Sequence, residues 1–319
     1  MGTAINTMNM MNEGKEFKQK TFFCPGHITG FFQICNHDDP HQKGSVGCGI
    51  ALDKGLLTTV SVFDKTEVFL NEKKEYGETI REVVSEMEII AQKRYNHSFH
   101  FNMSGISDFP PGSGFGISAA GALGTAFAIN ESLNLGLPRE ELVEMAHVAE
   151  VKAGSGLGDV AGESLGGLVL REKPGGTRFG KFHKIAAPEK KVFCLVLGEL
   201  STKEVISNPE HIKAINAAGK EAMERFQKTK TIESFMEESS AFTKKVGLLS
   251  DGAKKAIESV DENFGTAAQA MLGNTVFAMT KKCENKRLER EAEEHILKSL
   301  QRFGTVYECK IGSCGPKLI

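Results

Sequence analysis

The chain has 319 residues, enough for one large domain or two ordinary ones, and 40% of them are apolar, which can fill a core. Its net charge of −2 argues against a nucleic-acid-binding protein, and no apolar run is long enough to span a membrane. Residues 1–20 are polar and lack the apolar segment of a signal peptide, so we expect a flexible arm and a cytoplasmic protein. Seven scattered cysteines without a CxxC pair are typical of reduced thiols.

The N-terminal part is predicted to be rich in strands. Thr21–Cys24 is a short apolar run, and the Pro25-Gly26 pair after it predicts that the strand ends in a turn. A second strand-like run covers residues 50–63. Residues 80–91 carry apolar side chains at helical spacing, which predicts an amphipathic helix, and residues 99–103 alternate like a strand.

The segment between the first two strands contains four side chains of metal-binding type, at Cys35, His37, Asp39 and His41. Their spacing by two suits one face of a strand, but Pro40 interrupts such a strand. No distant second pair of ligand residues accompanies them in the sequence. A polar surface loop is therefore favoured over a structural zinc site, which stays open as the alternative.

The most distinctive stretch is PPGSGFGISAAGA, which runs directly into helix-forming residues. Glycines let backbone N–H groups point toward one centre, and the first N–H groups of a helix lack internal partners. This pattern favours phosphate binding over a simple tight turn, although the stretch lacks the Gly-Lys-Ser/Thr end of a Walker loop. We predict a phosphate-binding loop formed by Pro111, Gly112, Ser113, Gly114, Phe115, Gly116, Ile117, Ser118 and Ala119.

A second glycine-rich segment, GSGLGDV, follows a helix that is predicted to start at Pro138 and to end near Glu150. Its carboxylate, Asp159, has two interpretations. It either bonds nearby backbone N–H groups in an Asx-type turn, or it is a general base directed at a hydroxyl group.

Helical patterns dominate the C-terminal part, and we place a domain boundary near residues 186–188. Strands are predicted on either side of this boundary, at residues 167–171 and 192–197. Helices are expected at residues 208–227, 231–249 and 287–304, and residues 267–280 are interpreted as a helix broken at Gly273-Asn274. The last strand, residues 305–312, runs into a turn that contains Gly312 and Ser313.

These segments resemble the motifs of the GHMP kinases, in the order found in that family. PPGSGFGISAAGA resembles the second motif, P-x-G-x-G-L-G-S-S-A-A, with Phe115 and Ile117 as departures. FFCPGHITGFF resembles the first motif, with His27 in place of the family's Lys or Arg. Asp159 followed by Gly166-Gly167 resembles a string of the mevalonate kinases. FFCPGHITGFF and GLGDV together look most like the archaeal pantoate kinase branch, and residues 311–316 resemble a shortened third motif.

The resemblance implies a two-part α+β fold. Residues 1–20 would form the arm, residues 21–187 a strand-rich, ATP-binding domain with the phosphate loop, and residues 188–319 a ferredoxin-like C-terminal domain. The active site would lie between the two domains. The implied reaction is ATP-dependent phosphorylation of the primary hydroxyl of pantoate to 4-phosphopantoate in coenzyme A biosynthesis, with Mg²⁺ as cofactor. A small-molecule substrate is then the expected partner, without nucleic acid or membrane, and a homodimer stays open.

The resemblance also implies roles for individual residues. Asp159 is expected to be the catalytic carboxylate, and Ser118 and Glu150 are expected to hold the magnesium ion. His27 either orients the catalytic carboxylate or is a turn histidine with a satisfied ring. Acceptor contacts are expected from His27, Thr29, Ser45, Gly312 and Ser313. An anionic acceptor such as pantoate also needs a cationic partner, for which Arg171 and Lys43 are the candidates.

Two rival classes remain at this stage. One is a GHMP kinase for another small alcohol, such as homoserine, shikimate or mevalonate. The other is a non-catalytic ligand sensor built on the same fold. A sensor would not need Asp159, Glu150 and Ser118 together, so the presence of all three favours an enzyme.

Overall fold

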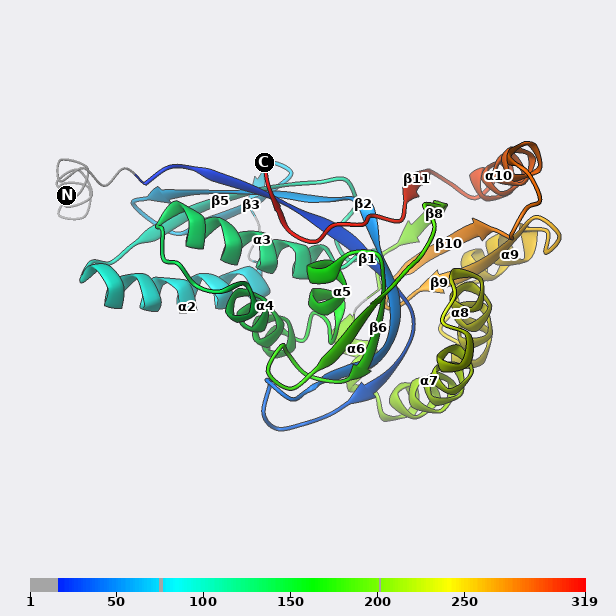
Figure 1. Cartoon of the computed structure of the whole chain (residues 1–319), viewed down its shortest axis with the longest axis horizontal. Coiled ribbons are helices and arrows are strands. Elements are labelled where there is room, and N and C mark those ends of the chain that lie inside the picture. The colour runs from blue at the N-terminus through cyan, green and yellow to red at the C-terminus, as the bar shows by residue number, and fades with distance from the viewer. Residues whose placement is uncertain (1–16, 75–76, 201) are drawn as a thin grey trace.

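A computed structural model describes residues 17–74, 77–200 and 202–319. Residues 1–16 of the predicted arm, which was expected to cover residues 1–20, lie outside the described residues. Phe17 packs edge-on against Tyr95 and Phe99, so the end of the predicted arm already contacts the body of the protein. Figure 1 shows an elongated molecule whose long sheet carries helices beneath it and whose C-terminal elements gather at one end.

The larger sheet is built on two long antiparallel strands. Its order is β12-β1-β2-β5-β3-β4, and β6 and β7 extend it from β2. Only β3 and β5 pair in parallel among the strand pairs that the structure describes. The strand bounds are β1 Lys20–Cys35, β2 Gly44–Phe63, β3 Glu67–Leu70, β4 Lys73–Lys74, β5 His100–Ser107, β6 Leu168–Lys173, β7 Lys181–Ile185 and β12 Lys317–Leu318.

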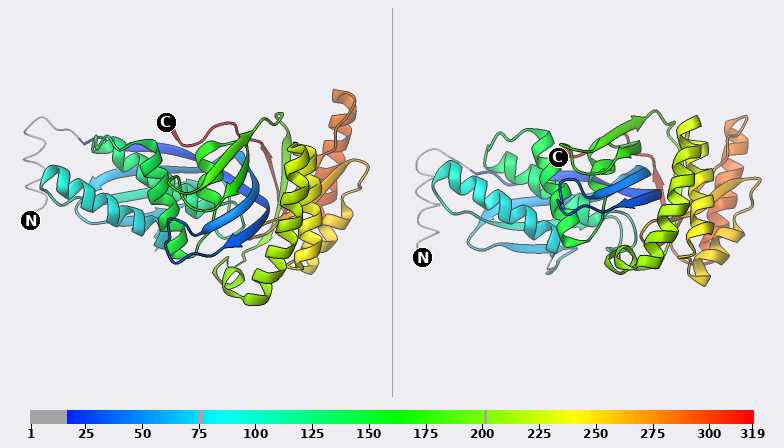
Figure 2. Two further views of the ribbon diagram at one scale, coloured as in Figure 1. Left: turned by 60° about the horizontal axis from the view of Figure 1, so that its bottom comes forward. Right: turned by 90° about the horizontal axis from the view of Figure 1, so that it is seen from below.

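Helices cover one face of this sheet, as the views from below confirm (Figure 2). The central helix is α3, which packs on β1 and β2 and contacts α2, α4 and α5. Small residues dominate α3, and all of it except a few positions is buried, so it can lie close to the sheet. The helix bounds are α2 Glu78–Tyr95, α3 Ile117–Ser132, α4 Arg139–Ala153 and α5 Asp159–Leu165.

The smaller sheet has the strand order β11-β8-β10-β9 and is antiparallel throughout. When the strands are numbered by their order in the chain, β8, β9, β10 and β11 become strands 1 to 4. Their order across the sheet is then 4-1-3-2, as in ferredoxin-like folds. The α+β prediction is therefore confirmed. The bounds are β8 Lys191–Gly198, α6 Thr202–Ser207, α7 Pro209–Thr229, α8 Ile232–Val246, α9 Asp251–Ser259, β9 Gly265–Ala270, β10 Asn274–Thr280, α10 Lys286–Gln301 and β11 Val306–Lys310.

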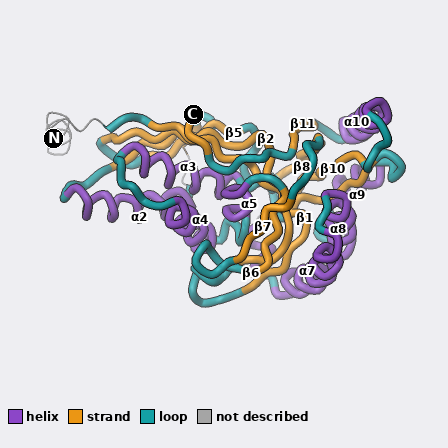
Figure 3. The backbone as a smooth tube through the Cα atoms, viewed as in Figure 1, coloured by secondary structure: helices purple, strands orange, loops and turns teal. Residues whose placement is uncertain are grey.

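Two sequence predictions about elements are wrong. The first strand does not end at Cys24, because β1 continues to Cys35 through register irregularities at Pro25/His27 and Thr29/Phe31. A bulge accommodates a residue without a backbone N–H inside a strand. Residues 267–280 are not a broken helix but a β9–β10 hairpin, shown as two strands in Figure 3. β10 also pairs with β8 along its other edge, and this pairing outweighs the local helix propensity of the alanines in the hairpin.

The end of the chain returns to the larger sheet. β12 pairs with the start of β1, and Figure 1 shows the C-terminus above the middle of that sheet. Among the described residues, none of the helices combines the length and the apolar character that a bilayer crossing requires.

Candidate active site

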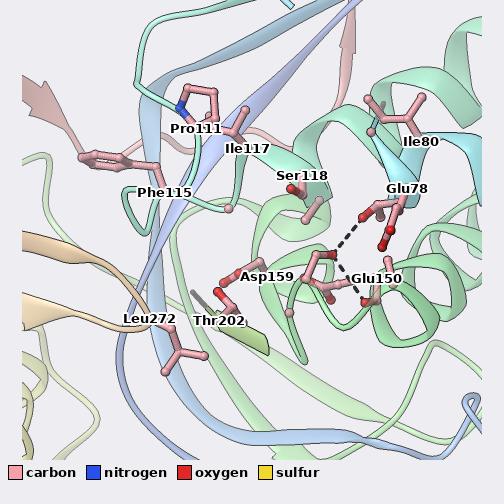
Figure 4. Close-up of a pocket in the computed structure, with 18 of the residues that line it drawn as sticks. Glu78, Ile80, Pro111, Phe115, Ile117, Ser118, Glu150, Asp159, Thr202 and Leu272 are labelled. Atoms are coloured by element: carbon pink, nitrogen blue, oxygen red, sulfur yellow. Dashed lines mark hydrogen bonds between the residues drawn. The ribbon is translucent and has the colours of Figure 1, made fainter. Parts of the chain in front are cut away.

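One cavity of about 440 Å³ brings together both glycine-rich segments and the tip of the β9–β10 hairpin. Figure 4 shows Ser118 near its centre, with Asp159, Thr202 and Leu272 below and Ile80 and Glu78 on the other side. Every residue predicted for the phosphate loop lines this cavity except Ser113, whose buried hydroxyl donates to the carbonyl of Pro110.

The phosphate loop has the backbone that its glycines predict. Gly112, Gly114 and Gly116 adopt left-handed φ values of 71°, 94° and 68°. Gly116 is the N-cap of α3 and offers no side-chain cap, so the first N–H groups of the helix stay available for an anion. Phe115 stacks on Phe109 with 3.9 Å between ring centroids and anchors the loop to the core.

The β9–β10 hairpin holds this loop from the C-terminal side. The hydroxyl of Thr275 donates to the carbonyl of Ser113 at 2.7 Å. A Cβ on Gly273 would lie 2.1 Å from the same carbonyl oxygen, so only glycine allows this approach. The two halves of the chain therefore meet directly at the phosphate loop.

Asp159 begins α5 and does not sit in an isolated turn. Its Oδ1 lies 2.8 Å from Nδ1 of His27 and 3.4 Å from the hydroxyl of Thr29. The Asp159 side chain is 22% exposed and lines the cavity, whereas His27 is fully buried. His27 therefore contacts Asp159 from behind and is not itself a wall of the cavity.

The buried surroundings of His27 keep its ring neutral. Burial lowers the pKa of His27, against the opposing hydrogen bond and charge of Asp159. A neutral ring that binds a carboxylate must carry its proton on Nδ1. Cβ atoms on Gly49 or Gly162 would lie within 2.4 Å of Nε2, which shows how tightly two glycines enclose the ring.

Glu150 approaches Asp159 from the end of α4. The backbone N–H groups of Asp159 and Val160 favour its charged form, and a Cβ on Gly156 would lie 2.2 Å from Oε1. Its Oε2 is buried without a hydrogen-bond partner in the described part of the chain. Burial and the charge of Asp159 raise the pKa of Glu150. Ser118, in the first turn of α3, lines the same cavity.

Arg171 is a buried cation whose charge interacts with Asp159 in the cavity. It is 1% exposed, lines the cavity and donates from Nη2 to the hydroxyl of Thr29 at 3.4 Å. Its Nε and Nη1 find no acceptor among the residues described. Ser45 also lines the cavity, and its hydroxyl donates to the carbonyl of Leu157.

Lys43, the other cationic candidate, does not line the cavity. Its carbonyl lies 3.0 Å from the ring of His147, which is buried on α4. The structure therefore separates the two candidates that the sequence left open.

Gly312 and Ser313 do not line the cavity, so the structure lends their predicted acceptor contact no support. The backbone of Gly312 bonds to Ala51 and Gly167, and the carbonyl of Ser313 accepts a bond from Lys184. These residues return the chain to the sheet. The segment that approaches the phosphate loop is instead the tip of the β9–β10 hairpin, residues 271–273. Its glycine, Gly273, was interpreted from the sequence as a helix break.

Cys35 is the last residue of β1, and residues 36–41 after it form a polar loop tied to α4. His41 Nδ1 lies 2.5 Å from the buried carboxylate of Glu144, and Asp39 accepts the backbone N–H of His41. No group of three or more His, Cys, Asp or Glu side chains is placed to hold a metal ion within the described ranges.

The chain also matches proteins of known class. Residues 79–167 match the family model described as the N-terminal domain of the GHMP kinases. A pantoate kinase of Methanocaldococcus jannaschii is 35% identical over 82% of this chain and 92% of its own. A pantoate kinase of Thermococcus kodakarensis is also 35% identical, over 81% of this chain and 87% of its own. The chain belongs to the GHMP kinase family.

A solved structure extends the likeness over the whole GHMP kinase fold. A protein described as a phosphotransferase related to the CoA biosynthesis pathway superposes with a TM-score of 0.79 at 29% identity. The alignment covers 95% of this chain and 99% of that one. The two-sheet architecture is thus shared from end to end.

Several residues of this GHMP kinase's cavity were not predicted from the sequence. They comprise two buried threonines, an acid at the start of α2, and a lysine and a leucine from the C-terminal part: Thr58, Thr125, Glu78, Lys203 and Leu272. A buried acid behind the phosphate loop, Glu163, was not predicted either, and it does not line the cavity. Glu163 follows Asp159 by one helical turn, a signal that would have required predicting α5. For the other residues, the local sequence pattern does not distinguish a side chain that faces a cavity from one that faces the core.

Glu163 is the most unusual of these residues. It is fully buried, and neither carboxylate oxygen has a partner in the part of the chain that the structure describes. A Cβ on Gly116 would lie 2.3 Å from Oε1, so the carboxyl group lies directly behind the start of α3. Burial, with the nearby charges of Asp159 and Glu150, raises the pKa of Glu163. A raised pKa favours the protonated form of this carboxyl group.

Proposed function

We propose that the protein transfers the γ-phosphoryl group of ATP to the primary hydroxyl of pantoate, forming 4-phosphopantoate for coenzyme A biosynthesis. The observation that carries this proposal is the pairing of Asp159 and Arg171 around Thr29, next to a phosphate loop. Thr29 lies 3.4 Å from both side chains. Pantoate carries a primary hydroxyl, the proposed acceptor, and a carboxylate, and these two side chains match these two groups.

The phosphate chain would bind the backbone of Gly112–Ala119 and the start of α3. Fixed N–H dipoles stabilise charge that develops in phosphoryl transfer without reorganisation. Residues 21–187 would thus form the nucleotide domain, and residues 188–319 would complete the site through the hairpin.

Mg²⁺ fits the oxygen atoms beside this loop. The hydroxyl of Ser118 and the unpartnered Oε2 of Glu150 are ligands of the type that this ion prefers. When bound, it would neutralise charge on the phosphate oxygens.

Asp159 would accept or steer the proton of the acceptor hydroxyl. His27 donates from Nδ1 to Oδ1, which fixes the carboxylate of a side chain that lines the cavity. We therefore assign His27 as a positioning residue and keep substrate contact for Thr29 and Ser45, which line the cavity.

Arg171 would bind the acceptor carboxylate through its free Nε and Nη1 groups. Arg171→Gln should raise the KM for pantoate by at least about tenfold and change the KM for ATP little, because a charged hydrogen bond is worth about 1.5–3 kcal/mol. Lys43→Gln is the matched control and should leave both constants unchanged. A larger effect of the Lys43 variant would reverse the assignment.

The decisive experiment measures ADP release with ATP and a panel of acceptors: pantoate, homoserine, shikimate and mevalonate. The proposal expects pantoate to support the highest kcat/KM. ADP release with a different acceptor only would overturn the substrate and leave the kinase assignment in place. Binding of ATP without release with any acceptor would favour a ligand sensor.

A further inference from the structure

The tip of the β9–β10 hairpin reaches from the acceptor groups to the phosphate loop. The backbone N–H of Met271 donates to the carbonyl of Thr29 at 2.9 Å, and the two residues form an isolated β-bridge. Two positions later, a Cβ on Gly273 would lie 2.5 Å from the Cα of Gly114. Leu272 lies between these two contacts, at the end of the hairpin strands in Figure 4. It therefore lies beside the point where an acceptor held at Thr29 would meet a phosphate group held by the loop.

The acceptor end of the cavity has an apolar wall beside its polar groups. This wall consists of four side chains from β1, the segment before α5 and the hairpin tip: Phe32, Leu157, Met271 and Leu272. The first three are buried, whereas Leu272 is half-buried and has the largest exposed fraction of the four. Apolar surface in contact with water gains free energy when an apolar group of a ligand covers it. An acceptor with only hydroxyl and carboxylate groups would leave the Leu272 side chain uncovered.

The polar groups of the site do not by themselves select one acceptor. Pantoate, homoserine, shikimate and mevalonate all carry a hydroxyl and a carboxylate, so each could be bound by Asp159 and Arg171. Pantoate differs from the other three at the carbon next to the reacting one, because that carbon bears two methyl groups. When its primary hydroxyl lies between Asp159 and the phosphate loop, these methyl groups must lie close to the same point, where the hairpin tip places Leu272.

We propose that Leu272 contacts the two methyl groups of pantoate and makes the site selective for an acceptor that is branched next to its reacting carbon. An unbranched acceptor would bind the same polar groups but would lose the dispersion contacts with this side chain. Because the methyl groups adjoin the reacting carbon, the contact also restricts how the hydroxyl lies relative to the phosphate loop. This inference rests on the proposed phosphorylation of pantoate and adds the residue that recognises its branched carbon.

Two acceptors and three variants test the proposal. The acceptors are pantoate and 2,4-dihydroxybutanoate of the same configuration, which has the same hydroxyl and carboxylate groups but lacks both methyl groups. Leu272→Ala removes the proposed contact, and Leu272→Met keeps an apolar side chain of similar volume. Leu297→Ala is the matched control, because Leu297 is a partly buried leucine on α10 that does not line the cavity. Coupled ADP release gives kcat/KM for both acceptors, and calorimetry gives the Kd for a non-hydrolysable ATP analogue.

Wild type should prefer pantoate by at least about tenfold in kcat/KM, the size expected for two methyl groups in an apolar contact. Leu272→Ala should lose most of this preference through a lower kcat/KM for pantoate, with little change for the unbranched acceptor and for ATP binding. Leu272→Met and Leu297→Ala should keep most of the preference.

Equal use of both acceptors by wild type would overturn the inference and leave the kinase proposal intact. An equal loss with both acceptors in Leu272→Ala would also overturn it, because Leu272 would then support the hairpin and the phosphate loop instead of selecting the acceptor. Failure of wild type to release ADP with pantoate would overturn the proposed function and the inference with it.

Discussion

The Nδ1 atom of His27 lies 2.8 Å from Oδ1 of Asp159, although 132 positions separate the two residues in the chain. The bulge at Pro25/His27 in β1 delivers the ring to the first turn of α5. Because glycines 49 and 162 enclose the ring, it cannot swing away from the carboxylate. The geometry therefore places a neutral donor where many GHMP kinases carry Lys or Arg.

His27→Ala should lower kcat by about 10–100-fold, because a misplaced catalytic group loses about that much. His27→Asn keeps an N–H donor near the position of Nδ1 and should recover much of the loss. ATP binding should not change in either variant. Steady-state kinetics on both proteins, with calorimetry of nucleotide binding, tests this. Equal losses in the two variants would show that His27 contributes packing rather than orientation.

Asp159→Asn should lower kcat by about 10²–10⁴-fold and leave nucleotide binding nearly intact, because general-base assistance contributes about that factor. If positioning matters more than proton removal in the loose transition state, the Asn variant loses little and Asp159→Ala loses more. Asp64→Asn, an exposed carboxylate outside the cavity, is the control. Wild-type turnover in both Asp159 variants would remove the residue from the mechanism.

Ser118→Ala and Glu150→Gln should each raise the Mg²⁺ concentration needed for half-maximal activity by about tenfold, which corresponds to about 1.4 kcal/mol. The reason is the loss of one oxygen ligand from the pair beside the phosphate loop. Ser104→Ala, on the exposed side of β5, should show the wild-type requirement. Magnesium titrations of ADP release measure the effect, and normal titrations of both site variants would reject the metal assignment.

Gly273→Ala should weaken nucleotide binding, because its Cβ would lie 2.1 Å from the carbonyl oxygen of Ser113 and push the hairpin from the phosphate loop. Gly273 does not adopt a left-handed φ, so this variant tests the contact and not backbone strain. We expect the Kd for an ATP analogue to rise by at least about tenfold. Gly252→Ala, with no neighbour closer than 3.7 Å, should bind normally. A normal Kd for Gly273→Ala would mean that the loop is held without the hairpin.

The sequence predicted those parts of the site that depend on local backbone chemistry. The glycines of the phosphate loop and the helix of Ile80 are local features, and the structure has both. Prediction from the sequence failed where a residue's contacts come from parts of the chain that are distant in the sequence. The local sequence of the β9–β10 hairpin favours a helix, and only its pairing with β8 makes it a pair of strands. The choice between Arg171 and Lys43 depends on which strand borders the cavity. Gly312 resembled a motif residue, but a glycine turn alone does not reveal which backbone lies beside it.

Glu163 leads to a prediction about pH. Its pKa is raised above the ordinary value of 4.5, so the folded protein keeps a proton that the unfolded chain releases. The stabilising contribution is fully present below about pH 4.5 and is lost as the pH rises through the folded pKa. Wild type should therefore lose up to about 1.4 kcal/mol of unfolding free energy per pH unit through this group in that window.

Glu163→Gln removes this titration and keeps the shape of the side chain. The unfolding free energy of the variant relative to wild type should therefore increase steadily as the pH rises, because groups away from Glu163 titrate alike in both proteins. Urea denaturation at several values between about pH 5 and pH 8 measures the difference. Glu258→Gln, at an exposed position on α9, is the matched control for the loss of one carboxyl group. A difference that stays constant with pH for Glu163→Gln would show that this carboxyl group is ionised in the folded protein, and that Asp159 then has a second negative charge one helical turn away.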